Sequence, residues 1–252
     1  ATGSAVVEVI PESSKYTINT IPADRLFRLL LILGVAEPQA RELTAAIIDW
    51  RSASPQGQSP FDSFYAQQPS AFLAPHASIQ ELEELLLIKG MTPDLFYGHF
   101  TRDAEGAPVW HTALRDCLTT RSGAYGFDVN TVEPAVLASL DAPPAAIAQI
   151  VARRNAGPIR TMDEIKAILP PDIALKLRIG GGSIVTLRAT AWLNLDVGRP
   201  SETRKTVAAL VKLEGPGQSR LFTVLRWYDN VQSDLLPRNY TAPPVVAGGN
   251  GS

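Results

Sequence analysis

The chain contains an internal repeat, and this repeat constrains its fold more than any other feature. "YTINTIPADRLFRLLLILG" begins at Tyr16, and "FDVNTVEPAVLASL" begins at Phe127. Both run from an aromatic residue through Asn-Thr to a proline and then to apolar residues at helical spacing. Each copy continues with a helix that ends in arginine and then with a capped acidic helix. We therefore expect two copies of a small helical unit, with a long loop inserted into the first.

Capping signals mark the expected start of each helix. Asn19 or Thr20 is the expected cap of the first helix, with Pro22 in its first turn. Thr131 is the expected cap of the matching helix in the second copy. Gly34 ends the first helix because glycine readily adopts the conformation that follows a helix.

The third helix of each copy carries a capping box. In "SIQELEELL" the expected pair is Ser78 with Glu81, and in "TMDEIKAIL" it is Thr161 with Glu164. "TPDLFYGHF" adds a short helix with Thr92 as its cap. Between the copies, helical spacing suggests one further stripe, formed by Trp110, Leu114 and Leu118.

Outside the repeat the apolar residues recur with the period of a β-strand. "AVVEVI", which ends before Pro11, indicates one strand. "SIVTLRATAWLNL" alternates strictly from Val185 to Leu195, so one face of this strand is expected to be buried. "TRKTVAALVKL" and "LFTVLRWYDNV" continue the pattern and predict a three-strand antiparallel meander. The glycines at 180–182 are expected to form a flexible break before it.

These segments predict an α+β protein with one antiparallel sheet and a large helical insertion between its first and second strands. The expected parts are a β domain at 5–15 and 183–232, an inserted α-domain at 16–179, and a disordered tail at 236–252 that is rich in proline, glycine and asparagine. The α-domain contains a first helical repeat with the long loop at 16–100 and a second repeat at 127–178.

Composition excludes some classes of function. The 252 residues are 45% hydrophobic with a formal charge of -2, which suffices for real cores and gives no basic excess for phosphate contacts. Cys117 is the single cysteine, so an intramolecular disulfide and a cysteine-rich metal site are both excluded, and its role is not assigned. No apolar run in the sequence is long enough to span a bilayer.

Catalytic motifs are missing from the sequence. His76, His99 and His111 do not match a local metal-ligand spacing. The chain contains no phosphate loop, no nucleophile elbow and no zinc-protease helix. We therefore expect a protein that is not an enzyme and has no catalytic or cofactor-binding residues.

The second copy resembles the helix-hairpin-helix (SAM-like) repeats of competence-type DNA-binding proteins. Those repeats bind a phosphate through backbone N–H groups of a glycine-containing hairpin. Here Pro143 and Pro144 remove two such donors from the second hairpin, and the first retains only Gly34. Arg153 and Arg154 suit either phosphate contact or the stabilisation of a helix end. DNA binding is therefore the alternative rather than the preferred hypothesis.

Most of the chain, from Val6 to Tyr228, resembles the K class (GspK) of type II secretion minor pseudopilins. The motifs that carry the resemblance are "KYTINT", "LTAAIIDWR", "IQELEELLLIKGMTPDLF", "FDVNTVEPAVLASL" followed by "IVARR", and the closing "TLRATAWLNL" and "RKTVAALVKL". The resemblance implies a pilin-like sheet with an inserted α-domain, and a protein that is not an enzyme. It also implies a place at the pseudopilus tip, where the protein would initiate and cap the filament together with I- and J-class minor pseudopilins. A minor pilin of a related type IV filament is the second alternative.

The resemblance also implies a location. Such a protein is the periplasmic domain of an inner-membrane-anchored protein in a Gram-negative bacterium, and here its N-terminal transmembrane helix is missing. Its partners are the I- and J-class minor pseudopilins and the major pseudopilin filament, with no nucleic acid expected and membrane contact only through the missing helix. The sheet face that would cover this helix should be partly apolar and exposed. Individual interface residues are not assigned; the candidate surfaces are that face, the sheet edge and the exposed part of "LLLIKGMTPDLF".

Members of this family often place a calcium site after the "DWR" segment, built from a run of aspartates. This chain has Ser52, Ala53 and Ser54 there, which offer no carboxylate. Asp49 and Asp62 are weak calcium candidates, because two carboxylates give a hard cation too few charged oxygens. No metal is therefore expected.

Overall fold

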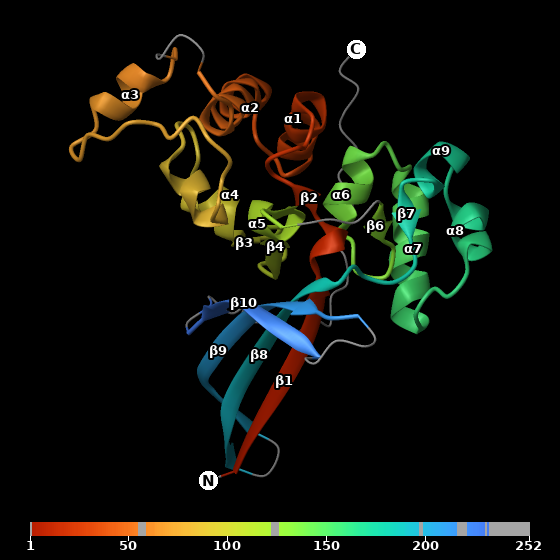
Figure 1. Cartoon of the computed structure of the whole chain (residues 1–252). Coiled ribbons are helices and arrows are strands. Elements are labelled where there is room, and N and C mark those ends of the chain that lie inside the picture. Colours follow the sequence, from red (N-terminus) through yellow and green to blue (C-terminus); the bar gives the residue numbers. More distant parts are fainter. Residues whose placement is uncertain are drawn as a thin grey trace.

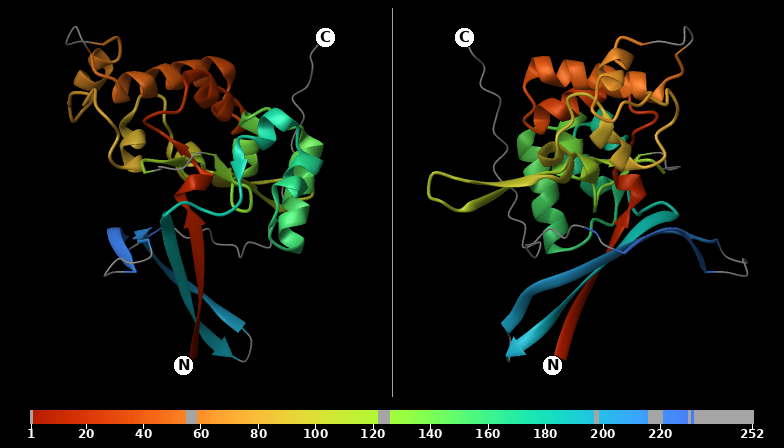
Figure 2. Two further views of the ribbon diagram at one scale, coloured as in Figure 1. Left: turned by 45° about the vertical axis from the view of Figure 1, so that its right-hand side comes forward. Right: turned by 90° about the vertical axis from the view of Figure 1, so that its left-hand side faces the viewer.

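The computed structural model describes residues 2–54, 59–121, 126–196, 199–215, 221–229 and 231. The expected disordered tail at 236–252 lies outside these residues. The described chain forms two lobes, a narrow twisted sheet and a broader helical lobe at one end of it (Figure 1). The N-terminal end of the first strand lies at the end of the sheet that points away from the helices (Figure 2).

The sheet lobe is a four-stranded antiparallel sheet. Its strands are β1 (Thr2–Pro11), β8 (Ile184–Asp196), β9 (Arg199–Leu213) and β10 (Phe222–Tyr228), in the order β1-β8-β9-β10. The predicted meander and the predicted α+β fold are confirmed. The first strand is longer than the sequence suggests, because it pairs with β8 over its whole length.

The crossing between the lobes is tightly packed. The buried carboxylate of Glu12, in the 3₁₀ helix η1 (Glu12–Ser14), accepts a hydrogen bond from Thr186 at 2.6 Å. A Cβ on Gly181 would lie only 2.7 Å from the Cβ of Pro11, so this close approach requires glycine. The backbone N–H of Gly182 donates to the Ser13 hydroxyl at 2.9 Å. The break predicted at the three glycines is present between β7 (Leu177–Arg178) and β8, and Gly181 and Gly182 in it are packed against the crossing.

The helical lobe contains two units that follow each other along the chain. The first comprises β2 (Tyr16–Thr17), α1 (Ala23–Ile32), α2 (Glu37–Arg51), α3 (Asp62–Ala66), η2 (Leu82–Leu87), α4 (Pro93–Tyr97), β3 (His99–Arg102), β4 (Pro108–His111), α5 (Leu114–Cys117) and β5 (Leu118–Thr119). The second comprises β6 (Phe127–Asp128), α6 (Pro134–Ser139), α7 (Pro144–Ala156), α8 (Met162–Ile168), α9 (Pro171–Ala174) and β7 (Leu177–Arg178). Among the described residues, no helix combines the length and the apolar character that crossing a membrane requires.

The repeated Asn-Thr pair does not cap a helix, contrary to the sequence prediction. The residue before α1 is Pro22 and the residue before α6 is Glu133, and neither side chain makes a capping hydrogen bond. The Thr131 hydroxyl instead donates to the Asp128 carboxylate at 2.7 Å. Pro134 is the first residue of α6, where its fixed φ suits a helix. Pro22, expected in the first turn of α1, instead lies just before the helix in an extended conformation.

The asparagine of each pair joins distant segments of its unit. The Asn19 amide donates to the carbonyl of Ile79 and its oxygen accepts from the N–H of the same residue, both at 2.8 Å. Asn130 makes the same two bonds with Ile159, at 3.0 and 2.7 Å. The side chain thereby copies the pairing of a β-strand and fixes the segment that leads into η2 or α8. This long-range role explains why the sequence repeats the residue.

Arginines and short strand pairs close both units in the same way. Arg51, at the end of α2, donates to the carbonyl of Ile21 at 2.6 Å, and Arg154, in the last turn of α7, donates to the carbonyl of Val132 at 2.7 Å. Two-residue parallel pairs, β2 with β5 and β6 with β7, then bring the end of each unit beside its beginning. Each unit is therefore a closed loop of chain.

The remaining local predictions are partly confirmed. The capping box of Thr161 with Glu164 and the cap at Thr92 are present. The predicted cap at Ser78 was wrong, because η2 is a 3₁₀ helix that begins three residues later, with Glu81 and Glu84 forming its box. The predicted stripe also does not exist as one helix: its members fall in β4, α5 and β5. Strand pairing here overrides helical spacing.

One hydrophobic core runs through both units of the helical lobe, and α1 packs against α6. Tyr16 and Phe127, the aromatic residues that open the two copies, meet edge to face with their ring centroids 4.8 Å apart. The Tyr16 hydroxyl lies 2.9 Å from the Ser139 hydroxyl of α6. The two units therefore form one folded body rather than two independent domains.

We predict that Asn130→Ala lowers the free energy of unfolding by about 2 kcal/mol, because both groups of Ile159 lose their partner. Urea denaturation followed by circular dichroism would measure the change. Asn155→Ala is the matched control: this asparagine is exposed on α7, and its replacement should change stability by less than about 0.5 kcal/mol. Equal effects of the two substitutions would contradict the proposed bridge.

Candidate functional site

The four-stranded sheet has one face that is almost entirely apolar. Cross-strand partners share a face, so the strand registers place a continuous set of side chains on one side. We call this set the apolar face; it comprises Val7, Val9, Val185, Leu187, Ala189, Leu193, Val207, Ala209, Val211, Leu213, Phe222, Val224 and Trp227.

Much of the apolar face is exposed. Val7, Leu193 and Trp227 retain 63%, 54% and 57% of their accessible surface. Only Val185 and its neighbours on β9 form a small buried cluster. The prediction that alternation along β8 marks a buried face was therefore wrong, whereas the expectation of an apolar, exposed sheet face is confirmed. A contiguous exposed apolar surface of this kind typically marks an interaction site.

The opposite face of the sheet has polar partners of its own. Arg188, which is 7% exposed, donates to both carboxylate oxygens of Glu8 at 2.7 and 3.1 Å. The hydroxyls of Thr190 and Thr206 lie 2.9 Å apart across β8 and β9. Charge-assisted and cross-strand bonds of this type satisfy the polar groups within the chain. The polar groups of this face are therefore bonded within the chain, whereas the apolar face leaves hydrophobic surface exposed to solvent.

The hairpin turns that would hold a phosphate in a DNA-binding repeat serve another purpose. Gly34, in the α1–α2 turn, has φ +87°, and Asp141, in the α6–α7 turn, has φ +73°. The carboxylate of Asp141 accepts a hydrogen bond from Arg25 of α1 at 2.9 Å and also pairs with Arg28. A carboxylate of one unit thus binds two arginines of the other, at the point where a nucleic-acid phosphate would be needed.

The arginines considered for phosphate contact are engaged within the second unit. Arg153 pairs with Glu164 at 2.5 Å and donates to the carbonyl of Gly157 at 2.8 Å. Arg154 donates to the Val132 carbonyl. These contacts hold α7 against the segments around it, so both arginines stabilise the fold.

The structure brings Asp49 and Asp62 together, and it adds a residue that the sequence gave no reason to choose. His76 lies beside both, with its Nε2 3.0 Å from Asp62 Oδ1 and its Nδ1 3.8 Å from Asp49 Oδ2. Ser59 also contacts both carboxylates, through its N–H to Asp62 Oδ2 at 2.7 Å and its hydroxyl to Asp49 Oδ2 at 2.9 Å. Only folding of the long loop could reveal this cluster, because its members are scattered along the sequence.

This cluster does not suit the calcium ion that the family resemblance suggests. Three of its carboxylate oxygens already accept hydrogen bonds from Ser59 and His76. Calcium takes six to eight oxygen ligands, several of them charged. Within the described part of the chain, no group of three or more histidine, cysteine or acidic residues is arranged to hold a metal ion. Asp49 and Asp62 therefore bond to Ser59 and His76 of the same chain.

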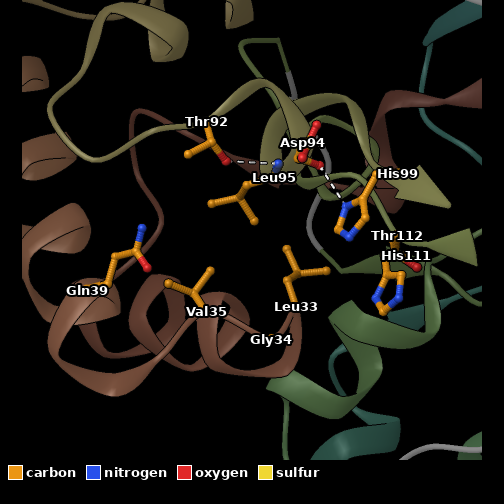
Figure 3. Close-up of a pocket in the computed structure, with 10 residues that line it drawn as sticks. All are labelled: Leu33, Gly34, Val35, Gln39, Thr92, Asp94, Leu95, His99, His111 and Thr112. Atoms are coloured by element: carbon orange, nitrogen blue, oxygen red, sulfur yellow. Dashed lines mark hydrogen bonds between the residues drawn. The ribbon is translucent and has the colours of Figure 1, made fainter. Parts of the chain in front are cut away.

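The other two histidines meet on the β3–β4 hairpin. His99 and His111 are cross-strand partners, and their rings stack in parallel with centroids 4.6 Å apart. They line one side of a pocket of about 170 Å³, opposite Leu33 and Val35 (Figure 3). Burial lowers the pKa of His111, and the neighbouring His99 lowers it further. The sequence spacing of the two histidines does not reveal this pair, because pairing of β3 with β4 brings them together.

The remaining sequence candidates lie in the core. Cys117 is fully buried, and burial raises the pKa of its thiol well above the ordinary value, so it packs as an apolar residue. In "LLLIKGMTPDLF", Leu85, Ile88 and Phe96 are buried, whereas Leu87 is half exposed. This segment therefore serves mainly as core and offers one apolar side chain to a partner.

We predict that Val9→Thr, at an exposed position of the apolar face, changes the free energy of unfolding by less than about 0.5 kcal/mol. Val211→Thr, at a buried position of the same face, should cost about 1–2 kcal/mol, because its hydroxyl would be buried without a designed partner. The two changes are matched, since both keep a β-branched side chain. Thermal and urea unfolding would compare them, and an equal cost at both positions would show that the face is packed throughout.

We also predict that calcium does not stabilise the protein. At about 10 mM calcium, above the dissociation constants of weak extracellular calcium sites, the melting temperature should equal that in a chelator. Differential scanning calorimetry would measure both samples. A calcium-dependent rise that Asp62→Asn abolishes would contradict our interpretation of the cluster.

Comparison with known proteins agrees with this architecture. Residues 7–97 match the family model described as "Type II secretion system (T2SS), protein K". The search of curated proteins gives no match. The structure resembles a chain of the crystal structure of the GspK-GspI-GspJ complex from the type 2 secretion system of enterotoxigenic Escherichia coli, with a TM-score of 0.56, 16% sequence identity, and coverage of 92% of this chain and 81% of that chain.

At this identity the structural match establishes the fold, and the family model adds a sequence similarity over residues 7–97. The family match and the shared fold agree with the resemblance found in the sequence: residues 7–97 are similar to protein K of the type II secretion system, and the whole fold is similar to that of a chain of the GspK-GspI-GspJ complex.

Proposed function

We propose that this protein works at the tip of the type II secretion pseudopilus, where it assembles with I- and J-class minor pseudopilins to initiate and cap the filament. The solved relative belongs to a complex of GspK with GspI and GspJ, which supports these partners. The major pseudopilin filament below the tip is the further partner in this proposal.

The exposed apolar face is the observation that carries the proposal. Val7, Val9 and Trp227 are each more than half exposed on one side of a regular sheet. Burial of apolar surface contributes about 25 cal/mol per Å², so an apolar helix would stabilise this face. In our proposal the helix is an N-terminal segment that anchors the protein in the inner membrane and later packs within the pseudopilus.

The helical lobe supports the capping role. It lies at one end of the sheet and is much broader than the sheet itself (Figures 1 and 2). Arg226 of β10 pairs with Glu81 at 2.7 Å and so ties the lobe to the sheet. A subunit with such a lobe at its upper end would block the addition of another subunit above it.

DNA binding receives no support from the geometry. The hairpin turn of the second unit is filled by the pairing of Asp141 with Arg25, and Arg153 pairs with Glu164. A minor pilin of a related type IV filament would share the apolar face, and its partners distinguish it from the proposed function.

We predict that this chain forms a stable complex with one copy each of its cognate I- and J-class soluble domains. Size-exclusion chromatography with light scattering would give the mass of the eluted complex. Failure of the chain to join partners that pair normally with each other would contradict the proposal. In a second experiment, binding of a fluorescent duplex DNA to the chain would be measured at low salt. Salt-sensitive binding would favour the DNA-binding alternative.

A further inference from the structure

The imidazole of His76 lies between acceptors from two other segments. Its Nε2 is 3.0 Å from Asp62 Oδ1, at the start of α3. Its Nδ1 is 3.2 Å from the backbone carbonyl oxygen of Asp49, near the end of α2, and 3.8 Å from the carboxylate of the same residue. All three side chains are mostly buried, with 16–19% of their surface exposed.

This geometry specifies the charge of the ring. A backbone carbonyl accepts hydrogen bonds and cannot donate one, and an ionised carboxylate has the same restriction. Neutral histidine carries one N–H and would leave one ring nitrogen facing an acceptor without a proton between them. Both contacts are satisfied together only when His76 is an imidazolium, with a proton on each nitrogen.

The backbone around the ring is held in an unusual conformation. His76 has φ +44°, in the left-handed region that residues with a side chain seldom adopt. The next residue, Ala77, donates its N–H to the carbonyl of Trp50 at 3.1 Å. Such a conformation persists when surrounding contacts compensate for its cost, and here those contacts include both partners of the ring.

We propose that the His76 imidazolium is an internal counter-ion that fastens the segment 59–77 to the end of α2, and that loss of its proton loosens this segment. The two carboxylates that suggested a calcium site are thus neutralised by a histidine of the same chain. This inference concerns regulation of the loop and does not depend on the proposed function.

The segment 59–77 also contacts α2 through an aromatic cluster. Tyr65 of α3 packs edge to face on Trp50 of α2 with ring centroids 5.3 Å apart, and Phe72 contacts both rings. These contacts are independent of pH. Loss of the imidazolium would therefore loosen the segment locally rather than unfold the helical lobe.

The charged surroundings of His76 favour its protonated form. Burial lowers the pKa of His76, but the hydrogen bonds to Asp62 and to the Asp49 carbonyl, with the charges of both carboxylates, outweigh burial and raise it above its ordinary value of 6.5. Burial first, and then the same two carboxylates, raise the pKa of Tyr65, so its hydroxyl stays neutral. Lys89, the cation near the Phe61 and Phe64 rings, pairs with Glu42 at 2.6 Å.

The sign of the pH dependence follows from these shifts. A raised histidine pKa gives stabilisation that is complete below pH 6.5 and is lost as the pH rises through the pKa in the folded protein. The Ser59 N–H, opposed by burial and aided by His76, lowers the pKa of Asp62 below 3.8, so its contribution is lost only in stronger acid. The segment is therefore held most firmly between these limits, in mildly acidic solution.

Nuclear magnetic resonance of the histidine rings tests the charge directly. The chain has three histidines, so the ring spectrum is simple and His99→Gln and His111→Gln assign it. We expect His76 to carry protons on both nitrogens at pH 6 and to titrate at a higher pH than His111, because the pKa of His76 is raised and that of His111 is lowered. A neutral His76 ring at pH 6 would overturn the proposal without any variant at that position.

Hydrogen exchange measured by mass spectrometry tests the consequence. After correction for the intrinsic pH dependence of exchange, peptides from 59–77 should exchange roughly tenfold faster above the titration of His76 than below it, as loss of a charge-assisted bond implies. His76→Gln should give fast exchange at both pH values, and His99→Gln, the matched control, should behave as the unmodified chain. A pH response in this segment that survives His76→Gln would refute the inference.

Discussion

The antiparallel pairing of β1 with β8 is the constraint on which the rest of the structure depends. It joins residues at the start of the chain to residues that follow the entire helical lobe, with Pro11 opposite Val185 at its upper end. The helical lobe must therefore leave the sheet and return to it at one place. The crossing there is compact because Glu12 and Ser13 bond to the returning chain and Gly181 allows contact with Pro11. Such long-range closure costs loop entropy, which the many bonds of the ladder offset.

Within this frame, the two helical units use one set of interactions twice. An asparagine side chain copies a strand pair, an arginine at the end of the second helix binds the carbonyls near the unit's start, and a two-residue parallel pair closes the loop. The units then differ where they meet. Asp141 binds Arg25 and Arg28 of the other unit, so the hairpin has become an internal contact. A hairpin that resembles phosphate-binding repeats in sequence is here stabilised by a carboxylate of the same chain.

The two lobes differ in how much of their apolar surface they bury. The helical lobe buries most of its apolar residues in one continuous core, and Arg25 and Arg153 pair within the lobe. The sheet pairs its polar face through Arg188 and Glu8 but leaves most of its apolar face exposed. The proposed role as a filament subunit is consistent with this asymmetry, because exposed apolar surface of this kind typically marks an interaction site. Among the described residues, the helical lobe contains only two-stranded sheets.

The sequence by itself determined the repeat, the change from helical to strand period, the meander and the K-class resemblance, because these are local or periodic signals that survive without three-dimensional context. It also located Asp49 and Asp62, although it could not show what lies between them. Only the tertiary structure decided that Asn19 and Asn130 bridge rather than cap, that the apolar side of β8 is exposed, and that His76 joins the two aspartates. Each of these outcomes depends on contacts between segments distant in sequence. Alternation reveals that a strand has two unlike faces, but which face meets water depends on what the rest of the chain places against it.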